Sequence, residues 1–270
     1  MTVNTEVQLS IVTVCWNDLA NVQHTIESLK MQTAGAGWEH VLMDGASTDG
    51  TAEWYQSAGL GFPHRLVCEP DNGIFDAMNK SLEIVRGDYI MFMNAGDRFA
   101  DDGAVARVLN RIEAQPAWGY SKARMVDGDG KKVRPDVGHK PYSRFKHRFR
   151  LAQICHQTVV MRVDFLRSLG GFDLRMGHGS DYHLLIKAAS RESPSVWDDV
   201  DVDYLVGGVS DREVHRGLWL GHRIRVDALS LKPVGAGLDR MWTASQVANV
   251  WARKKLKPVL GQAYWKLRNR

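Results

Sequence analysis

Residues 9–30 read LSIVTVCWNDLANVQHTIESLK, a pattern of a buried strand followed by an amphipathic helix. Residues 9–15 form a run dominated by apolar and β-branched side chains, which is typical of a strand covered on both faces. Asn17 or Asp18 can cap the helix that follows, in which apolar residues recur with a period of 3.6. A strand buried on both faces and joined directly to a helix favours a parallel sheet with helices packed against it.

The same alternation of strand and helix continues over the first hundred residues or so. Strands are predicted at 39–44, 65–69 and 88–93, and helices at 51–57 and 74–85. A β-α-β-α-β-α-β series builds a mostly parallel, doubly wound sheet, because each helix returns the chain to the same end of the sheet. We therefore predict the α/β class, with a Rossmann-like central sheet flanked by helices.

The middle of the chain is less regular. The turn DGDG at 127–130 predicts a hairpin between residues 122–126 and 131–134. A short strand is predicted at 157–162, and an amphipathic helix is predicted from Ser180, its N-cap.

A helical C-terminal segment is predicted beyond about residue 212, with a break marked by Pro233 and two nearby glycines. We therefore divide the chain into a first domain, residues 1–211, and a basic helical segment, residues 212–270.

The formal net charge of +4 conceals an uneven distribution. Residues 139–150 carry five Lys/Arg and no acid, and residues 251–270 carry seven and no acid. The remainder has 23 basic and 31 acidic residues, a charge near −8. This pattern argues against a nucleic-acid binder, whose positive charge lines a groove, and favours local docking to an anionic ligand or membrane surface.

Several classes of protein are excluded. No apolar run approaches the roughly 18–20 residues of a membrane-spanning helix. Residues 1–10 have neither the basic nor the apolar region of a secretory signal, so a cytoplasmic protein is expected. The three cysteines (Cys15, Cys68 and Cys155) are widely spaced and are expected to be reduced core thiols.

Polar residues follow the predicted strands at the edge where parallel sheets bind ligands. The four strand ends carry Cys15–Asn17, Asp44, Glu69–Asp71 and Asn94–Asp97. Acids that converge on one crevice repel one another unless a cation or ligand offsets their charge, which favours a metal or nucleotide site. Neither a P-loop nor a GxGxxG motif after the first strand is present.

Six segments follow one another in the order SIVTVCWND, VLMDGASTDGT, EPDNGIFDAMNKSL, GDYIMFMNAGD, HQTVVMR and GSDYHLLIK, and GGVS at 207–210 closes the series. In this order and spacing, over roughly residues 8–210, they resemble family 2 glycosyltransferases with the GT-A fold, most closely bacterial enzymes of exopolysaccharide assembly of the colanic-acid type.

The resemblance implies transfer of a sugar, with inversion, from a nucleotide-sugar donor to an acceptor hydroxyl, with a UDP-sugar favoured. Asp181 would be the general base that deprotonates the acceptor. The positions that would contact the donor are Thr13, Cys15, Asn17, Asp44, Asn72, Gly73, Asp76, Asn79, Asn94 and Asp97.

A divalent cation, Mg²⁺ or Mn²⁺, is implied as the cofactor, because charge builds on the departing diphosphate. Asp97 would hold it, with His178 as a further candidate ligand. The family often has D-x-D-D where this chain has Asn94-Ala95-Gly96-Asp97, so one acid remains to bind the metal. His156 and Gln157 are candidate diphosphate contacts, whereas His183 is expected to point elsewhere.

The basic segments fit the anionic acceptor that the resemblance implies, a lipid-linked oligosaccharide diphosphate. Cations interleaved with aromatic residues over 251–270 suit a segment lying on the inner face of the cell membrane. Residues 139–150 are predicted to form a mobile loop over the active site, where Arg144, Lys146 and Arg148 would meet the acceptor phosphates.

Two alternatives stay open. A sugar nucleotidyltransferase also uses a Rossmann-like sheet and Mg²⁺, but residues 15–22 lack the Gly-rich, Arg-containing loop that would hold a triphosphate. A catalytically inactive, nucleotide-sugar-binding scaffold of a polysaccharide assembly complex is compatible with the missing acids at positions 94 and 96.

Overall fold

The computed structural model describes residues 6–207 and 214–268, with side chains described over 6–207 and 217–252. Contacts divide the chain into two compact units, residues 1–209 and 210–270. The predicted division after residue 211 falls close to this boundary. Of the GGVS motif, only Gly207 lies within the described residues.

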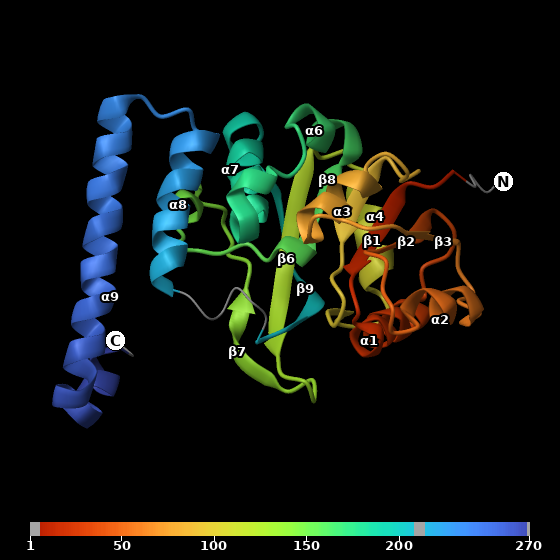
Figure 1. Cartoon of the computed structure of the whole chain (residues 1–270), viewed down its shortest axis with the longest axis horizontal. Coiled ribbons are helices and arrows are strands. Elements are labelled where there is room, and N and C mark those ends of the chain that lie inside the picture. Colours follow the sequence, from red (N-terminus) through yellow and green to blue (C-terminus); the bar gives the residue numbers. More distant parts are fainter. Residues whose placement is uncertain (1–5, 208–213, 269–270) are drawn as a thin grey trace. The chain divides into compact units, whose positions relative to one another are not determined.

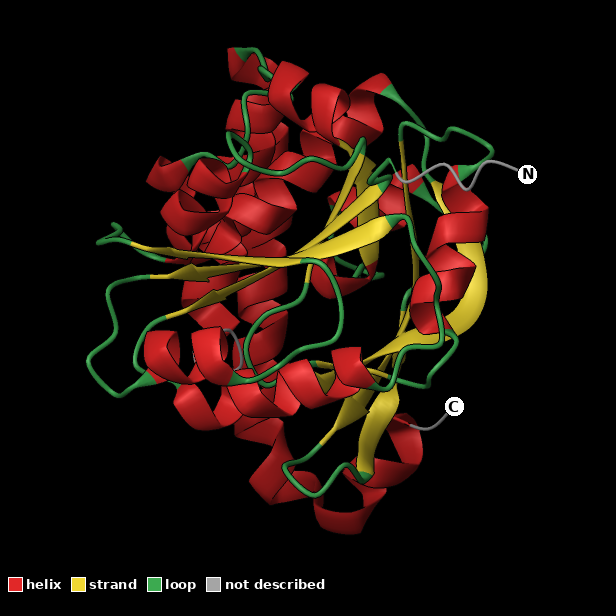
Figure 2. Ribbon diagram, turned by 90° about the vertical axis from the view of Figure 1, so that its right-hand side faces the viewer, coloured by secondary structure: helices red, strands yellow, loops and turns green. Residues whose placement is uncertain are grey.

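The larger unit is built on one twisted, mixed sheet (Figure 2). Its strands lie in the order β3-β2-β1-β4-β8-β6-β9-β5, and β7 pairs with β6. Their bounds are β1 (Leu9–Cys15), β2 (Trp38–Asp44), β3 (His64–Cys68), β4 (Tyr89–Phe92), β5 (Arg98–Phe99), β6 (Trp118–Val126), β7 (Lys132–Val137), β8 (Val159–Arg162) and β9 (Ser195–Leu205). The predicted strands and the hairpin at 127–130 are confirmed, with ends shifted by a few residues.

Parallel pairing is confined to two parts of the sheet. The first four strands pair in parallel, β3 with β2, β2 with β1 and β1 with β4, as predicted. β8 then enters antiparallel to β4 and to β6, while β6 and β9 pair in parallel. The α/β class is therefore confirmed, and the sheet is more mixed than the doubly wound arrangement expected from the N-terminal series.

Helices cover both faces of the sheet (Figure 1). Alternate side chains of β1 point to opposite faces, so Leu9 and Ile11 join one apolar cluster and Val12 and Val14 join the other. The first cluster includes residues of α1 (Leu19–Lys30), α2 (Thr51–Ser57) and α4 (Ala104–Ile112); the second includes residues of α3 (Ile74–Ser81), α6 (Val163–Ser168) and α7 (Ser180–Arg191). The remaining short helices are α5 (Arg144–Arg148), η1 (His156–Thr158) and η2 (Leu174–Gly179).

Three helix ends differ from the sequence prediction. Asp18 occupies the N-cap position of the first helix, as predicted, but its side chain makes no capping hydrogen bond; Asp49 Oδ2 accepts the Leu19 N–H at 2.9 Å instead. The third helix ends at Ser81 rather than at residue 85, because the next backbone N–H groups bond three residues back and tighten the chain into a turn.

Ser180 is the first residue of α7 rather than its cap. Its hydroxyl lies 2.6 Å from the Asp173 carbonyl oxygen and 2.9 Å from that of Gly177. The residue therefore ties η2 to the start of α7.

Strand β9, which the sequence does not predict, carries four aspartates that are neutralised by basic residues of α4 and β6. Asp201 is 1% exposed and pairs with Arg107 at 2.9 Å and with Arg111. Asp203 pairs with Arg124 at 2.6 Å. The four aspartates give the sequence of β9 the polar character of a loop. Their negative charge is offset by basic residues that are far away in sequence.

Asp201→Ala is expected to lower the free energy of unfolding by about 2–4 kcal/mol, because it leaves two arginines short of a buried carboxylate. Asp198→Ala is the matched control: Asp198 pairs with Lys122 at 2.5 Å on the same strand but is 60% exposed, so solvent screens it. Urea denaturation measures both. Equal effects of the two substitutions would contradict a stabilising role for the buried pair.

The C-terminal unit is a helical pair, α8 (Val214–Ala228) and α9 (Pro233–Arg268). The predicted break precedes Pro233, which begins α9, and the two nearby glycines lie within that helix. Asp239 joins the helices, because its carboxylate accepts from Arg225 at 2.7 and 3.0 Å and contacts His222 at 2.7 Å. Within the described residues, no helix combines the length and apolar character needed to cross a membrane.

Candidate donor and catalytic site

The carboxyl ends of the parallel strands meet around Asp44, as predicted. Its Cα is in register with Cys15 on one side and with Cys68 on the other. The Cys15 thiol lies 3.3 Å from Oδ1, the Cys68 thiol lies 3.0 Å from Oδ2, and the Ser47 N–H donates to Oδ2 at 3.0 Å. Asp44 is 2% exposed, so its carboxylate is buried at the strand ends and held in one orientation by these contacts.

Asn17 holds the turn that follows Asp44. Its backbone has a positive φ of 49°, its N–H donates to Ser47 Oγ at 2.8 Å, and its Oδ1 accepts the Thr48 N–H at 2.8 Å. The ends of β1 and β2 are therefore tied together by side-chain to backbone hydrogen bonds.

Trp16 and Asp71 line the same strand ends, although neither is among the residues predicted to bind the donor. Trp16 is 68% exposed. A Cβ on Gly45 would lie 2.6 Å from Asp71 Oδ2 and 3.4 Å from Trp16 Cδ1, so a side chain at position 45 would displace the Asp71 carboxylate. An exposed tryptophan directly after a buried strand is the sequence signal that could have identified this wall of the crevice.

Thr13, a predicted donor contact, belongs to an interior hydrogen-bond network. It is fully buried, and its hydroxyl lies 3.0 Å from His40 Nε2, while Nδ1 lies 2.6 Å from the Tyr55 hydroxyl. Burial lowers the pKa of His40 to about 3, which keeps the ring neutral. The Thr13 hydroxyl therefore has a structural partner, and its contact with a donor stays a prediction.

The loop that carries Asn72 and Gly73 is organised by Asp76. Asp76 Oδ2 accepts from the backbone N–H of Asn72 at 2.9 Å and from its amide at 3.2 Å, and these bonds lower the pKa of Asp76. Gly73 has a φ of 109°, which favours glycine. Asp76 thus shapes the rim of the site from the start of α3.

Asn79, another predicted donor contact, also has a structural partner. Its Nδ2 donates to the Phe172 carbonyl at 2.9 Å, and its Oδ1 accepts the Phe172 N–H at 2.8 Å. Both ends of the amide join α3 to the segment before η2, and a contact between Asn79 and a donor stays a prediction. Helical spacing placed it beside Asp76 but could not show this long-range partner.

Asp97 is buried in the turn between β4 and β5, directly before Arg98, with 4% of its surface exposed. Oδ1 accepts the Leu205 N–H and Oδ2 accepts the Gln157 amide, both at 2.9 Å. Burial raises the pKa of Asp97 to about 7, against the effect of these two hydrogen bonds. The carboxylate therefore sits where a nearby positive charge would favour its ionised form.

The turn of residues 94–97 has Asn94 and Gly96 at two positions where the family often has aspartate. Gly96 has a φ of 94°, and a Cβ there would lie 3.2 Å from Leu205 Cδ2 and 3.3 Å from the Asn21 side chain. An aspartate at 96 would be strained. Asn94 Oδ1 is buried without a hydrogen-bond partner among the described residues.

η1 borders Asp97. Gln157 of η1 donates from its amide to Asp97 Oδ2 at 2.9 Å. Cys155, which precedes η1, is buried; burial raises the pKa of its thiol, and the charges of Asp97 and Asp181 raise it further. The hydrogen bond from Gln157 is therefore the contact that ties this short segment to the buried acid.

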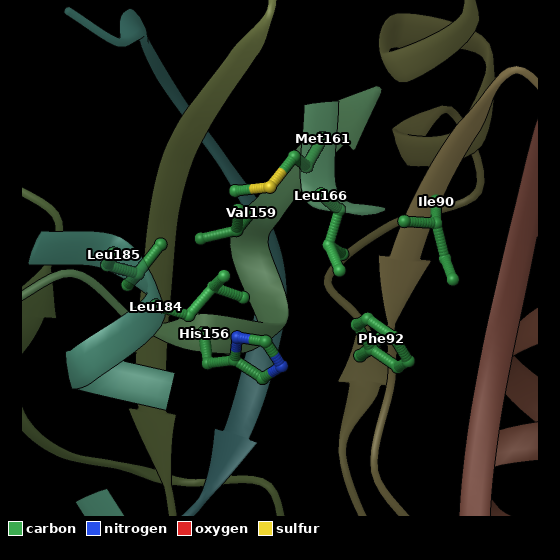
Figure 3. Close-up of a pocket in the computed structure, with 8 residues that line it drawn as sticks. All are labelled: Ile90, Phe92, His156, Val159, Met161, Leu166, Leu184 and Leu185. Atoms are coloured by element: carbon green, nitrogen blue, oxygen red, sulfur yellow. The ribbon is translucent and has the colours of Figure 1, made fainter. Parts of the chain in front are cut away.

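His156 lies in an apolar layer behind this segment. Figure 3 shows its ring at a small cavity lined by side chains of β4, β8, α6 and α7. The ring stacks on Phe92, with centroids 5.5 Å apart, and neither ring nitrogen has a hydrogen-bond partner among the described residues. Burial lowers the pKa of His156, against the effect of Asp181, so any contact with a diphosphate would be made by a neutral ring.

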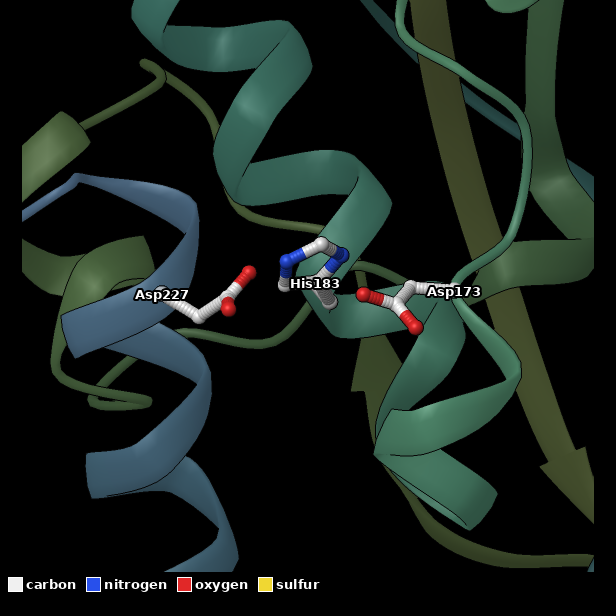
Figure 4. Close-up of side chains that lie close together, drawn as sticks. All are labelled: Asp173, His183 and Asp227. Carbon is white, nitrogen blue, oxygen red and sulfur yellow. The ribbon is translucent and has the colours of Figure 1, made fainter.

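Asp181 lies in the first turn of α7 and is partly exposed. Its Oδ1 accepts the Tyr182 N–H at 2.7 Å. His178 is exposed in η2, three residues earlier. His183 is 2% exposed and lies beside Asp173, as Figure 4 shows, two residues beyond Asp181 on the helix.

Residues 139–150 contain the short helix α5 and are tied to the start of α7. The Tyr182 hydroxyl donates to the Arg148 carbonyl oxygen, and the Arg150 guanidinium lies 5.1 Å from the centre of the Tyr182 ring. Arg144 and Lys146 are exposed, and Arg148 is partly buried. The predicted acceptor-binding cations are therefore fixed next to the residue that follows Asp181.

The oxygen atoms of the Asn94–Asp97 turn fit a hard divalent cation. Carboxylate and amide oxygens are the ligands that Mg²⁺ and Mn²⁺ prefer. The Asp97 carboxylate keeps lone pairs beyond its two hydrogen bonds, and the unpaired Asn94 Oδ1 belongs to the same turn. With one carboxylate in the set, the remaining charge would have to come from a diphosphate.

Residues 10–168 match the family described as glycosyl transferase family 2. The chain belongs to this family. An uncharacterized glycosyltransferase of Mycobacterium tuberculosis is 29% identical over 185 residues, which cover 67% of this glycosyltransferase and 68% of that protein. Asp181 lies beyond the matched residues.

Two solved structures share the fold of this glycosyltransferase. Residues 1–349 of S. aureus TarS, in complex with UDP, match 90% of this chain and 71% of that chain, with a TM-score of 0.66 and 15% identity. The mannosyltransferase PcManGT from Pyrobaculum calidifontis, in complex with GDP-Man and Mn²⁺, matches 96% of this chain and 76% of its own chain, with a TM-score of 0.61 and 17% identity. The mixed sheet with flanking helices is therefore a GT-A-like fold, as predicted.

Proposed function

We propose that this protein is an inverting glycosyltransferase that moves a sugar from a nucleotide-sugar donor to a hydroxyl of a lipid-linked oligosaccharide in exopolysaccharide biosynthesis. The observation that carries this proposal is the buried Asp97 carboxylate, which Gln157 of η1 holds within a domain that matches the glycosyl transferase family 2. Asp97 is buried, which suits a contact with a cation and a diphosphate. Asp181 is partly exposed, which suits proton transfer from an acceptor.

The nucleotide would occupy the ends of β1 to β3. Asp44 supplies a fixed carboxylate that can accept from the N–H of a base or a ribose hydroxyl, and Trp16 offers an exposed ring for stacking. Cys15, Asn17, Asn72 and Gly73 complete the surroundings of this position. Family membership together with the UDP bound to TarS favours a UDP-sugar.

Asp97, with Asn94, would hold the divalent cation. When bound, the cation neutralises charge on the departing diphosphate. Gln157 keeps the Asp97 carboxylate oriented through its 2.9 Å hydrogen bond, and His156 and His178 are candidates for further contacts to the diphosphate or cation. The Mn²⁺ of PcManGT supports a metal-dependent reaction.

Asp181 would accept the proton of the acceptor hydroxyl. As that oxygen bonds to the anomeric carbon on one face of the sugar, the bond to the diphosphate breaks on the opposite face, and the configuration inverts. A carboxylate in the first turn of α7 is accessible and held by the Tyr182 N–H, as a general base must be.

A thermal-shift screen tests this function. UDP-, GDP- and dTDP-sugars are added to the full chain with Mg²⁺ or Mn²⁺. A donor that binds the folded state increases the free energy of unfolding by RT ln(1 + [L]/Kd) and so raises the Tm. At least one sugar nucleotide should therefore raise the Tm more with the cation than without it. No shift with any donor would contradict the proposal.

Trp16→Ala is expected to weaken binding of the nucleotide donor by about tenfold or more, since aromatic stacking on a base is worth about 1–3 kcal/mol. Trp251→Ala is the matched control, because Trp251 is a similarly exposed tryptophan (55%) in the C-terminal unit. Titration calorimetry with the nucleotide measures both. An unchanged Kd for Trp16→Ala would remove the stacking role.

Replacing Arg144, Lys146 and Arg148 together by alanine is expected to raise the acceptor KM by about tenfold, because charge-assisted hydrogen bonds to phosphate are lost. Steady-state kinetics with a short-chain, water-soluble acceptor diphosphate measure this change. The donor KM serves as the internal control and should stay the same. Unchanged acceptor kinetics would contradict a role for these cations.

A further inference from the structure

Two large apolar side chains on the segment of residues 144–151 face solvent. Phe145 is 59% exposed and Leu151 is 54% exposed. Arg144, Lys146 and Arg150 beside them are exposed as well. Apolar side chains interleaved with cations are typical of segments that lie at a membrane interface. We call this segment the docking segment.

The stretch of sequence that contains the docking segment carries charge of one sign. Residues 137–163 contain no aspartate or glutamate, although the body of the protein is acidic. His147 does not add charge at neutral pH, because burial lowers its pKa to about 4. The positive charge therefore comes from lysine and arginine, which stay ionised at all physiological pH values.

The docking segment is held by the fold. Ser143 caps α5 by accepting the Lys146 N–H at 3.2 Å, and the buried His147 lies 3.2 Å from the Tyr142 hydroxyl through Nδ1. Tyr182 bonds to the Arg148 carbonyl from α7. These contacts fix the backbone from which Phe145 and Leu151 project.

We propose that the docking segment attaches the protein to an anionic membrane surface, with Phe145 and Leu151 entering the interface between headgroups and acyl chains. Arg144 and Lys146 would lie at the level of the lipid phosphates, since cations near an anionic leaflet favour binding. The inference rests on the lipid-linked acceptor of the proposed function. It goes beyond that function by placing the membrane contact in the larger unit. There the docking segment contacts Tyr182, the residue that follows Asp181.

Co-sedimentation with vesicles tests the proposal. The full chain is mixed with phosphatidylcholine vesicles that contain about 30 mol% phosphatidylglycerol, an anionic lipid, or none. The chain should sediment with the anionic vesicles and not with the neutral ones, and high salt should release it without changing its Tm. Equal binding to both vesicle types would overturn the proposal.

The double substitution Phe145→Ser/Leu151→Ser is expected to lower the vesicle partition coefficient by at least about tenfold, because two apolar side chains no longer enter the interface. Met31→Ser/Val133→Ser is the matched control, since Met31 (60%) and Val133 (44%) are also exposed in the same unit. Control binding should equal that of the unmodified chain. All substituted side chains are exposed, and thermal melting confirms that the variants are folded.

Two further results would overturn the proposal. One is competition by millimolar inorganic pyrophosphate, which would identify a soluble phosphate ligand. The other is loss of binding with Leu238→Ser/Met241→Ser in α9, without loss for Phe145→Ser/Leu151→Ser, which would place the contact in the C-terminal unit.

Vesicle binding requires no donor, so the two proposals fail separately. If no nucleotide sugar shifts the Tm while vesicle binding follows the docking segment, the transferase function fails and the docking stands. If donors bind but the docking-segment variant sediments as the unmodified chain does, the docking alone fails.

Discussion

Asp181→Asn is expected to lower kcat by about 10²–10⁴-fold, because the amide cannot accept the acceptor proton in the transition state. Asn has the shape of Asp, and its Oδ1 can still accept the Tyr182 N–H, so the first turn of α7 should be preserved. Donor binding should also be unchanged, since Asp44, Trp16 and Asp97 lie on other elements. Turnover of the best donor from the thermal-shift screen and nucleotide Kd by calorimetry measure the two quantities.

Asp164→Asn is the matched control for this substitution. Asp164 lies in the first turn of α6, as Asp181 lies in the first turn of α7, but its side chain is 69% exposed and pairs with Arg162. Its replacement should leave kcat unchanged. Full turnover by Asp181→Asn would assign the base to another residue, and absence of turnover in both the unmodified chain and the variant would favour the inactive scaffold.

The part of the site that was predictable from sequence is the part set by backbone periodicity. Buried strands and the edge at which they end predict that Cys15 and Asp44 lie side by side, and the register of β1 and β2 confirms this, because parallel strands present their carboxyl ends together. The role of Asp181 is implied by the family resemblance alone and stays a prediction, since no spacing rule links residues in α7 to β4.

The parts that were not predictable depend on partners distant in sequence. Thr13 was assigned to the donor site, but its hydroxyl meets His40 on the next strand. Asn79 was assigned there as well, but Phe172 takes both ends of its amide. The capping hydrogen bond of α1 comes from Asp49 for the same reason. In each case the predicted helix or strand is present, and tertiary packing decides which partner the side chain contacts.

Asp97→Asn is expected to lower kcat/KM by about 10²–10³-fold, because the turn loses its carboxylate toward the cation and the developing diphosphate charge. The substitution is nearly isosteric, and its amide oxygen can still accept the Leu205 N–H, but its NH₂ group cannot accept from Gln157, so the hydrogen bond to η1 is lost. The rise of Tm that a nucleotide sugar produces with Mn²⁺ should fall to the value seen without the cation. Activity measured over a Mn²⁺ titration and thermal shift report on the same carboxylate by independent routes.

Asn94→Asp provides the opposing test. Asn94 Oδ1 is buried and unpaired, so a carboxylate there adds charge to the same turn without the strained backbone that position 96 imposes. The variant should reach half-maximal activity at a lower Mn²⁺ concentration, by about tenfold, and should be less stable without the cation because its charge is then unpaired. Opposite shifts in the Mn²⁺ requirement of Asp97→Asn and Asn94→Asp would support the Asn94–Asp97 turn as the cation site. If neither substitution altered the Mn²⁺ requirement, the turn would be a structural link between β4, α1 and η1, and the diphosphate charge would have to be met by other residues of the crevice.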